Sequence, residues 1–320
     1  MIFLAEVATG PFIRAWTVTM HATTHEIVPR PYPFDRDRLS ALLAALIQQQ
    51  APAGAWNWLD VEAATGNAPR FYGAFAQMPR KTGKSVIAIS TDDAETLNAL
   101  VPHFTIGGWT LDRLARVWLL LQLDASDRER YLRQVEQLFR AADMNELVAA
   151  YSALPVLAYG PAWKLRCAEG IRSNIGDVLE AIMCRNPYPA AHLDDPAWNQ
   201  MVLKAFFTGK PVNEIVGLAE RNNPELAAIL IDYAHERQAA GRPVNPLLWR
   251  CVAPFLDEGS LPDIARLLES ADTGVQAAGA LACRDSRYPP AQALLKQYPR
   301  LEGAVVSGAL SWDALILTPS

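Results

Sequence analysis

Apolar residues recur every three to four positions along most of the chain, which is the spacing of one face of an α-helix. The first such stripe follows Asp35 and continues to residue 46, and a second covers residues 110–123. The same pattern predicts helices over 162–184, 196–208, 223–240, 245–256, 260–269 and 273–284. We therefore expect an all-α protein of about twelve helices.

Helix boundaries are marked by side chains that cap exposed backbone groups. Asp35 or Asp37, Thr110 and Ser126 precede apolar stripes, and Asp195, Asn223 and Asn245 are each followed by proline. An Asx cap followed by proline in the first turn is a common way to begin a helix. The breaks between helices are short, which favours antiparallel neighbours. The prediction is an irregular α–α superhelix of HEAT-like repeats without an exact period.

Two segments depart from this pattern. Residues 1–38 contain Pro29, Pro31 and Pro33, which favour an extended extension over a helix. His21 and His25 have an i,i+4 spacing, but a zinc site needs more ligands than the sequence supplies nearby. The run 86–89 is strand-like but alone cannot form a sheet. We expect an extension over 1–38, a helical-repeat domain over 39–285, and a C-terminal cap and tail over 286–320.

Composition excludes some classes of protein. Hydrophobic residues make up 51% of the chain and charged residues 20%, which is typical of a globular protein. The net charge is −5 and no run of Lys and Arg is longer than a pair, so no nucleic-acid partner is predicted. No apolar run reaches the roughly 18 residues that a transmembrane helix needs. The four cysteines, Cys167, Cys184, Cys251 and Cys283, form no CxxC motif and fit a reducing cytoplasm.

Motifs for catalysis and cofactor binding are incomplete. The run FYGAFAQMPRKTGK (71–84) ends like a phosphate-binding loop, but Met78 stands where the first glycine is needed. His235-Glu236 begins like a zinc-protease motif, but Ala239 stands where the second histidine is needed. No cofactor or metal is predicted. A cysteine–histidine dyad stays open, although the cysteines lie at apolar helix positions, where buried inert thiols are common.

Polar residues are densest in the apolar pattern between residues 169 and 250. Gln200 and Lys204 share a helix face, as do Asp232 and Glu236. If these two helices pack together, the polar groups converge and could bind an anionic or polyhydroxylated ligand. The alternative is that they cap neighbouring helices. The candidate ligand-binding residues are Arg172, Asn174, Asn186, Tyr188, Asn199, Gln200, Lys204, Tyr233, His235, Glu236 and Arg237, with Glu169 nearby.

The same stretch carries a resemblance to a known family. The motifs are ARVWLLL (115–121), EGIRSNIGDVLEAIMCRNPYP (169–189), AWNQMVLKAFF (197–207), DYAHERQAAGRPV (232–244) and LWRCV (248–252). They closely resemble the EboA family, and the resemblance covers roughly residues 39–285. It departs at Gln238, where a tryptophan is more usual, and residues 1–38 have no counterpart.

The EboA resemblance implies an all-helical protein from gene clusters that encode a prenyltransferase, a metal-dependent hydrolase and sugar-processing enzymes. It implies a role in traffic or export of a secondary-metabolite precursor. Our leading hypothesis is a non-enzymatic cytoplasmic protein that binds a metabolite or a pathway protein. One alternative is an enzyme acting on a prenylated or polar cyclic metabolite, with His235, Glu236 and Lys204 transferring protons. Another is a scaffold that docks a membrane prenyltransferase, a form of peripheral membrane docking, through an exposed apolar face.

Overall fold

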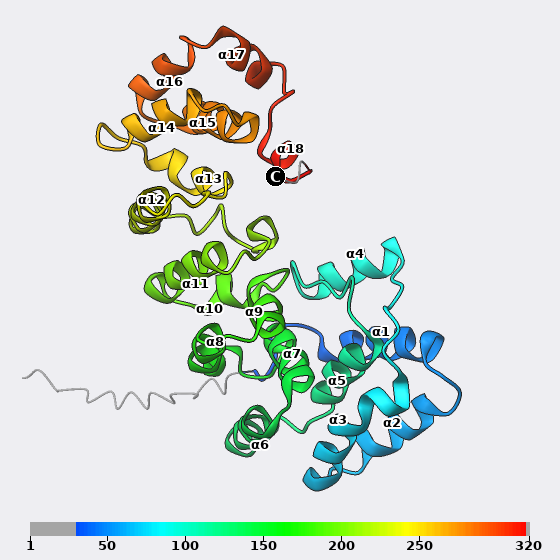
Figure 1. The fold of residues 1–320 in the computed structure, drawn as a ribbon. Helices are drawn as coiled ribbons and strands as arrows, with labels where there is room; N and C mark the ends of the chain where they lie inside the picture. Colours follow the sequence, from blue (N-terminus) through cyan, green and yellow to red (C-terminus); the bar gives the residue numbers. More distant parts are fainter. Residues whose placement is uncertain (1–29, 318–320) are drawn as a thin grey trace, which may run out of the picture. The chain divides into compact units, whose positions relative to one another are not determined.

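A computed structural model describes residues 30–317. Residues 1–29 of the predicted extension, with the pair His21 and His25, lie outside the described residues. The chain divides into two units, 1–30 and 31–320, and the second is described here. Residues 30–317 contain eighteen α-helices and no β-strand, which confirms the all-α prediction (Figure 1). The expected number of about twelve helices is wrong. The finer prediction of HEAT-like repeats stays a prediction.

Residues 30–317 form α-helices joined by turns and short 3-10 helices. The α-helices are α1 (Arg36–Gln50), α2 (Ala55–Ala64), α3 (Ala68–Thr82), α4 (Thr91–Leu100), α5 (Leu111–Leu121), α6 (Arg128–Ala141), α7 (Met144–Ser152), α8 (Lys164–Ile171), α9 (Gly176–Met183), α10 (Tyr188–His192), α11 (Asp195–Phe207), α12 (Pro224–Ala239), α13 (Leu248–Val252), α14 (Leu261–Leu268), α15 (Thr273–Asp285), α16 (Pro289–Leu295), α17 (Pro299–Val306) and α18 (Trp312–Leu317). Four single turns of 3-10 helix are η1 (Leu154–Val156), η2 (Gly160–Trp163), η3 (Val212–Glu214) and η4 (Ala253–Phe255).

The extra helices come from breaks that the hydrophobic pattern hides. The predicted helix 162–184 divides into α8 and α9, and residues 172–175 between them form no helix. Helices α10 and α13 have only five residues each, which is too few to show a 3.6-residue period. The pattern therefore predicts helical content better than it predicts the number of helices.

Side-chain caps begin many of the helices. Asp35 accepts a hydrogen bond from the backbone N–H of Arg38, and Asp143 and Glu146 form a reciprocal capping box on α7. The cap of α6 is Asp127 and not Ser126, so that prediction was one residue early. Thr110 occupies the N-cap position of α5, but its side chain makes no capping hydrogen bond.

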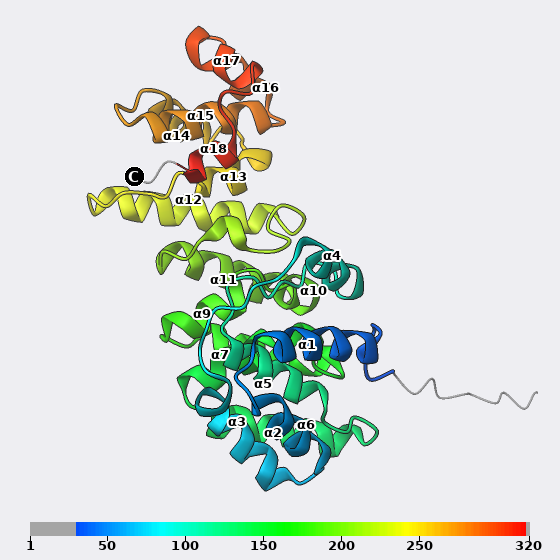
Figure 2. The same ribbon diagram turned by 90° about the vertical axis from the view of Figure 1, so that its right-hand side faces the viewer.

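Helix α5 lies at the centre of the helices before residue 160. It contacts α1, α3 and α7 (Figure 2). Ten of its eleven residues are buried. A helix buried on all sides must satisfy its polar groups internally. Arg116 does so by donating to Asp112 at 2.8 Å and to the carbonyl of Phe75 at 2.9 Å.

The run 86–89 does not form a β-strand, and the run 71–84 does not form a phosphate-binding loop. Val86 makes one isolated antiparallel bridge with Thr110. Residues 71–82 are helical within α3, where Phe71, Phe75 and Met78 are buried. Helix α3 ends at Gly83, so the run forms a helix end and a turn and no phosphate-binding loop.

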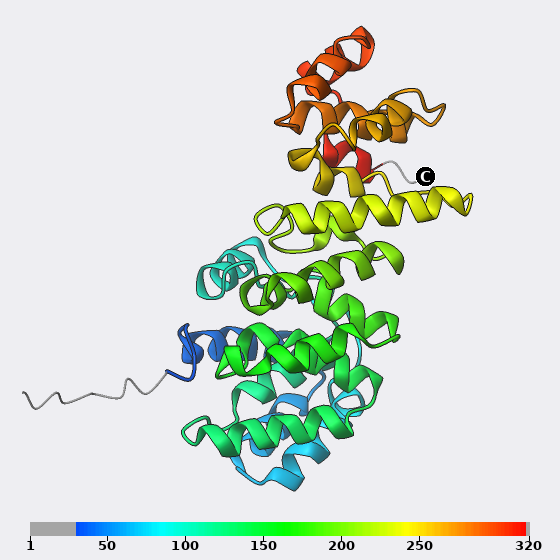
Figure 3. The ribbon, with the colours of Figure 1, turned by 90° about the vertical axis from the view of Figure 1, so that its left-hand side faces the viewer.

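The helices after residue 160 contact their neighbours in the chain. Helix α8 contacts α9, α11 contacts α12, α12 contacts α13, and α15 contacts α13, α14, α16, α17 and α18. Figures 1 and 3 show α8, α11 and α12 at successive levels, coloured green to yellow. This order brings residues 168–236 around one cavity.

Candidate functional site

A cavity of about 850 Å³ opens between α8, α11 and α12. Its polar residues come from the end of α8, from one face of α11 and from the middle of α12. Apolar residues form the rest of the wall. The lining is Ala168, Ile171, Arg172, Asn174, Asp194, Pro196, Ala197, Gln200, Leu203, Lys204, Phe207, Tyr233 and Glu236.

Helix α11 builds the largest part of this wall because its two faces differ. Its lining residues recur at 196, 200, 203 and 207, the spacing of one helix face. The opposite face, with Trp198, Met201 and Val202, is buried. The cap of this helix is Asp194 and not the predicted Asp195, and it accepts a hydrogen bond from the N–H of Ala197 at 3.1 Å. The buried face and the cap together fix which side chains reach the cavity.

Six of the eleven predicted ligand-binding residues line this cavity. Five of them make no side-chain hydrogen bond within residues 30–317, so their polar groups are free to meet a ligand. The sixth, Lys204, donates from Nζ to the carbonyl of Ser173 at 2.7 Å and so holds the turn after α8. The five with free side chains are Arg172, Asn174, Gln200, Tyr233 and Glu236.

Three of the other predicted residues satisfy buried backbone or amide groups. The amide nitrogen of Asn186 donates to the carbonyls of Tyr151 and Ala181, at 3.2 and 2.9 Å. The Tyr188 hydroxyl donates to the carbonyl of Gly160 at 2.7 Å. Asn199 exchanges two hydrogen bonds with the amide of Asn223, at 3.1 and 2.9 Å. Asn186 and Asn199 are each 4% exposed, which fits the capping interpretation for both.

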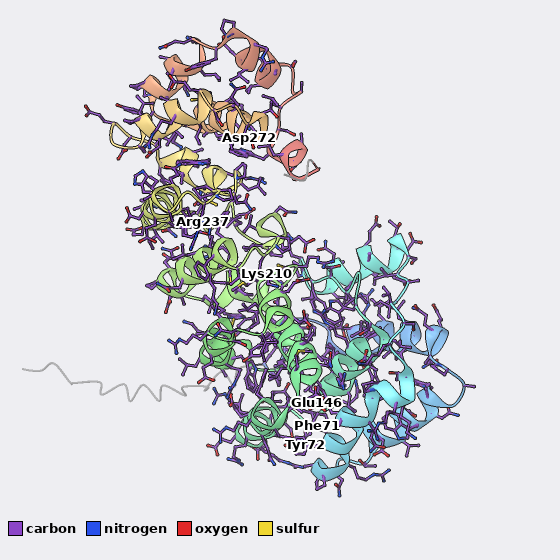
Figure 4. The ribbon with its side chains drawn as sticks, in the orientation of Figure 1. Phe71, Tyr72, Glu146, Lys210, Arg237 and Asp272 are labelled. Atoms are coloured by element: carbon purple, nitrogen blue, oxygen red, sulfur yellow. The ribbon has the colours of Figure 1, made fainter. Side chains whose placement is uncertain are left out.

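The remaining two predicted residues, and Glu169, lie outside the cavity lining. Arg237, labelled on α12 in Figure 4, donates twice to the carbonyl of Pro243 and closes the end of that helix. Glu169 is paired with Arg166 at 2.7 Å. His235 faces α14, where its Nε2 lies 2.9 Å from a carboxylate oxygen of the buried Asp263.

The proton-transfer groups of the enzyme hypothesis do not share one site. Glu236 and Lys204 line the cavity, but His235 is the next residue along α12, and consecutive helical residues point about 100° apart. Its ring is already paired with Asp263, which Arg266 also contacts. The cavity thus lacks the base that this hypothesis assigns to His235.

The cysteines are poor nucleophiles. All four are free and buried. Burial raises the pKa of Cys167 and Cys251 to about 12 and that of Cys283 to about 11. Burial, together with Glu180, raises the pKa of Cys184 to about 12. The thiolate is therefore strongly disfavoured at neutral pH, and these side chains fit packing better than a cysteine–histidine dyad.

A second, smaller cavity was not predicted as a site, although one of its lining residues, Asn186, is among the predicted ligand-binding residues. It measures about 240 Å³ and lies between α5, α7 and α9, with Trp109, Asp112, Arg113 and Arg185 in its wall. Arg113 stands inside an apolar stripe and Arg185 inside the RNPYP motif. A basic residue among buried apolar ones is the signal that could have identified Arg113.

Comparison with known proteins identifies one family. The model of the family described as metabolite traffic protein EboA matches residues 39–253, more than half of the 320-residue chain. This region contains every residue that lines either cavity. Searches of curated proteins and of solved structures returned no match.

Proposed function

The chain belongs to the EboA family of metabolite traffic proteins, and from this premise we propose that it carries a secondary-metabolite precursor in the cavity between α8, α11 and α12. The protein acts by binding, within traffic or export of that precursor, and not by changing it chemically. The ligand class is a prenylated molecule with a hydroxylated or anionic polar head.

The observation that carries this proposal is the free hydrogen-bonding capacity around the cavity. Arg172, Asn174 and Gln200 supply donors, and Glu236 supplies acceptors, with no internal partner among residues 30–317. Groups of this kind bind polar ligand atoms strongly when they are already placed. The cavity volume of about 850 Å³ falls in the range of roughly 300–1,000 Å³ that drug-sized ligands occupy.

Apolar groups beside the polar ones support a prenylated ligand. Ile171, Leu203 and Phe207 line the cavity, and Phe207 is 70% exposed although it is large and aromatic. Leu165 is 80% exposed and precedes the lining residues Ala168 and Arg172 by three and seven positions, so it shares their face of α8. An apolar chain covering these side chains would remove apolar surface from water.

The same exposed groups favour a pathway enzyme as the partner that receives the ligand. Leu165 and Phe207 stand at the side of the cavity and could contact a prenyltransferase at a membrane surface. Among residues 30–317 no helix is both long and apolar enough to cross a bilayer. A cytoplasmic location belongs to the same proposal, because four free thiols suit a reducing compartment.

A binding experiment with a geranylated 4-hydroxybenzoate as probe tests this function. We expect heat of binding in titration calorimetry and a rise in melting temperature, because a ligand of the native state stabilises it. Arg172→Gln should weaken binding about tenfold and leave the melting temperature of the free protein unchanged. Arg172 is a better test than Lys204, because Lys204 also holds the carbonyl of Ser173.

Arg133→Gln is the matched control, because Arg133 is an exposed arginine on α6 whose partner is the exposed Glu129. This variant should bind the probe like the wild type. Absence of binding, or equal binding by the wild type and Arg172→Gln, would overturn the proposal. Turnover of the probe, followed by mass spectrometry, would favour the enzyme alternative.

A further inference from the structure

The smaller cavity is lined by an arginine, Arg113, that forms no ion pair within residues 30–317. Arg113 extends from the first turn of α5, and its guanidinium stacks on the Trp109 ring, 4.3 Å from the ring centroid. Its Nε donates to the hydroxyl of Ser152 at 2.8 Å, whereas its two terminal nitrogens have no hydrogen-bond partner among residues 30–317. Burial and then the nearby Arg185 lower the pKa of Arg113 to about 10. The cavity thus presents two free guanidinium nitrogens from a largely buried cation.

Arg185 supplies a second guanidinium at the same cavity. Its backbone has φ of 53°, a left-handed conformation that costs a non-glycine residue roughly 1–2 kcal/mol. The surrounding structure holds it there, because its backbone N–H donates to the carbonyl of Glu214 at 2.8 Å and its Nη1 to that of Gly107 at 3.3 Å. Its Nε is paired with the Glu214 carboxylate at 3.0 Å. Arg185 is therefore a positioned side chain with donors left over.

Asp112 has an acceptor oxygen that lacks a donor, whereas the two arginines have donors that lack acceptors among residues 30–317. This carboxylate is 3% exposed, and it accepts from Arg116 with Oδ2, while its buried Oδ1 has no partner. A buried acceptor without a donor costs free energy, of the order of 1–3 kcal/mol. Two further carboxylates line the cavity: Glu180, paired with Lys210 (labelled in Figure 4) at 3.5 Å, and the exposed Asp177. The cavity wall therefore offers a carboxylate acceptor for a ligand's hydrogen-bond donor as well as guanidinium donors for an anion.

We propose that this cavity binds a small amphoteric carboxylate of amino-acid size. The carboxylate of the ligand accepts hydrogen bonds from Arg113 and Arg185, because guanidinium groups match a carboxylate in shape and charge. Its ammonium group donates to the free oxygen of Asp112 or to Asp177. The volume of about 240 Å³ is below the range of roughly 300–1,000 Å³ for drug-sized ligands, which limits the site to small molecules.

This site is independent of the metabolite cavity. Asp112, Arg113 and Arg185 line the smaller cavity only, whereas Arg172 and Lys204 line the larger one only. A purely anionic ligand such as phosphate would satisfy the arginines and leave Asp112 without a donor. An amine alone would do the reverse. The pairing of free donors with a free buried acceptor is what selects a zwitterion.

Titration calorimetry of the full chain with each of the twenty standard amino acids tests the proposal. We expect at least one to bind with a millimolar or lower dissociation constant, and Arg113→Gln and Arg185→Gln each to weaken that binding about tenfold or more. The side chain of Arg185 is half-exposed, so Arg185→Gln should fold even if Arg113→Gln does not. Arg172→Gln should bind the amino acid like the wild type, which separates this site from the proposed function.

Two further probes test the need for both charges. The decarboxylated amine and the deaminated acid of the best ligand should each bind at least about tenfold more weakly. No binding by any of the twenty, or full binding by the Arg185→Gln variant, would overturn the proposal. Equal binding by the deaminated acid would show that Asp112 takes no part, and the site would then be a simple anion site.

Discussion

Asn199 and Gln200 are adjacent on α11 and have opposite roles. The amide of Asn199 is buried and paired with Asn223, which itself caps α12 by accepting from the N–H of Leu226. Gln200 is exposed to the cavity and has no internal partner among residues 30–317. Consecutive side chains on a helix point about 100° apart, so Asn199 contacts the neighbouring helix while Gln200 faces the cavity.

Substitution of the two residues should separate stability from binding. Asn199→Ala removes both hydrogen bonds to Asn223 and should lower the free energy of unfolding by about 1–3 kcal/mol. Gln200→Ala, one position away on the same helix, should change it by less than about 0.5 kcal/mol. Urea unfolding followed by circular dichroism measures both. Equal losses in the two variants would show that the Asn199–Asn223 pair contributes nothing specific.

At the residue scale, the sequence predicted which polar residues share a helix face but not which groups each of them contacts. Gln200 and Lys204 were correctly placed on one face, because i,i+4 spacing fixes that relation within a helix. Asn186 and Asn199 could not be separated from them, since their roles depend on carbonyls and amides 5 to 35 residues away. Arg113 was missed because its environment depends on Trp109, Ser152 and Arg185, which the folded chain brings to it.

At the element scale, Gly170 allows α8 to approach α7 and α9. A Cβ atom at this position would lie 2.5 Å from Ile182 Cδ1 and 2.5 Å from Tyr151 Cε1. Both of these side chains are buried, so neither can move aside freely. The close approach places the end of α8, and with it Arg172, at the wall of the larger cavity.

Gly170→Ala should therefore destabilise the protein, while a glycine without such neighbours should behave in the opposite way. We expect a loss of about 1–3 kcal/mol for Gly170→Ala from overpacking. Gly73 lies inside α3, and a Cβ there meets only the end of the Gln77 side chain, at 3.8 Å. Gly73→Ala should raise stability by about 0.5–1 kcal/mol, because alanine favours helix. Thermal unfolding of both variants measures the contrast, and stabilisation by both would contradict the packing argument.

The sequence predicted long elements well and short ones poorly. Asp35 and Asn223 mark true helix starts, because a cap acts through the next two or three residues and is visible locally. The break between α8 and α9 has no such local mark. It is held by Lys204, which donates to the carbonyl of Ser173 from 31 residues away. Breaks of this kind account for much of the gap between about twelve expected helices and the eighteen found in residues 30–317.

At the scale of the whole described unit, contacts join helices that are close in the chain. Helix α15 contacts α13, α14, α16, α17 and α18, all of which are near it in sequence, and α1 contacts α4 and α5. When each element depends mainly on its neighbours, local free energies of opening can differ along the chain. The two cavities both lie before residue 240, so a change near the C-terminus should leave them intact.

A substitution in α15 tests this independence. A Cβ atom at Gly279 would lie 2.9 Å from Leu267 Cβ and 3.2 Å from the backbone nitrogen of Leu268, so Gly279→Ala should push α14 and α15 apart. We expect amide hydrogen exchange to quicken in α13 to α17 and to stay unchanged in α1 to α9, because the lost contacts are local. Mass spectrometry of peptides from both regions measures this, with Gly303→Ala as control, since a Cβ there meets nothing within 4 Å. Uniformly faster exchange would instead mean that residues 31–317 unfold as one cooperative unit, and that ligand binding in either cavity stabilises every helix equally.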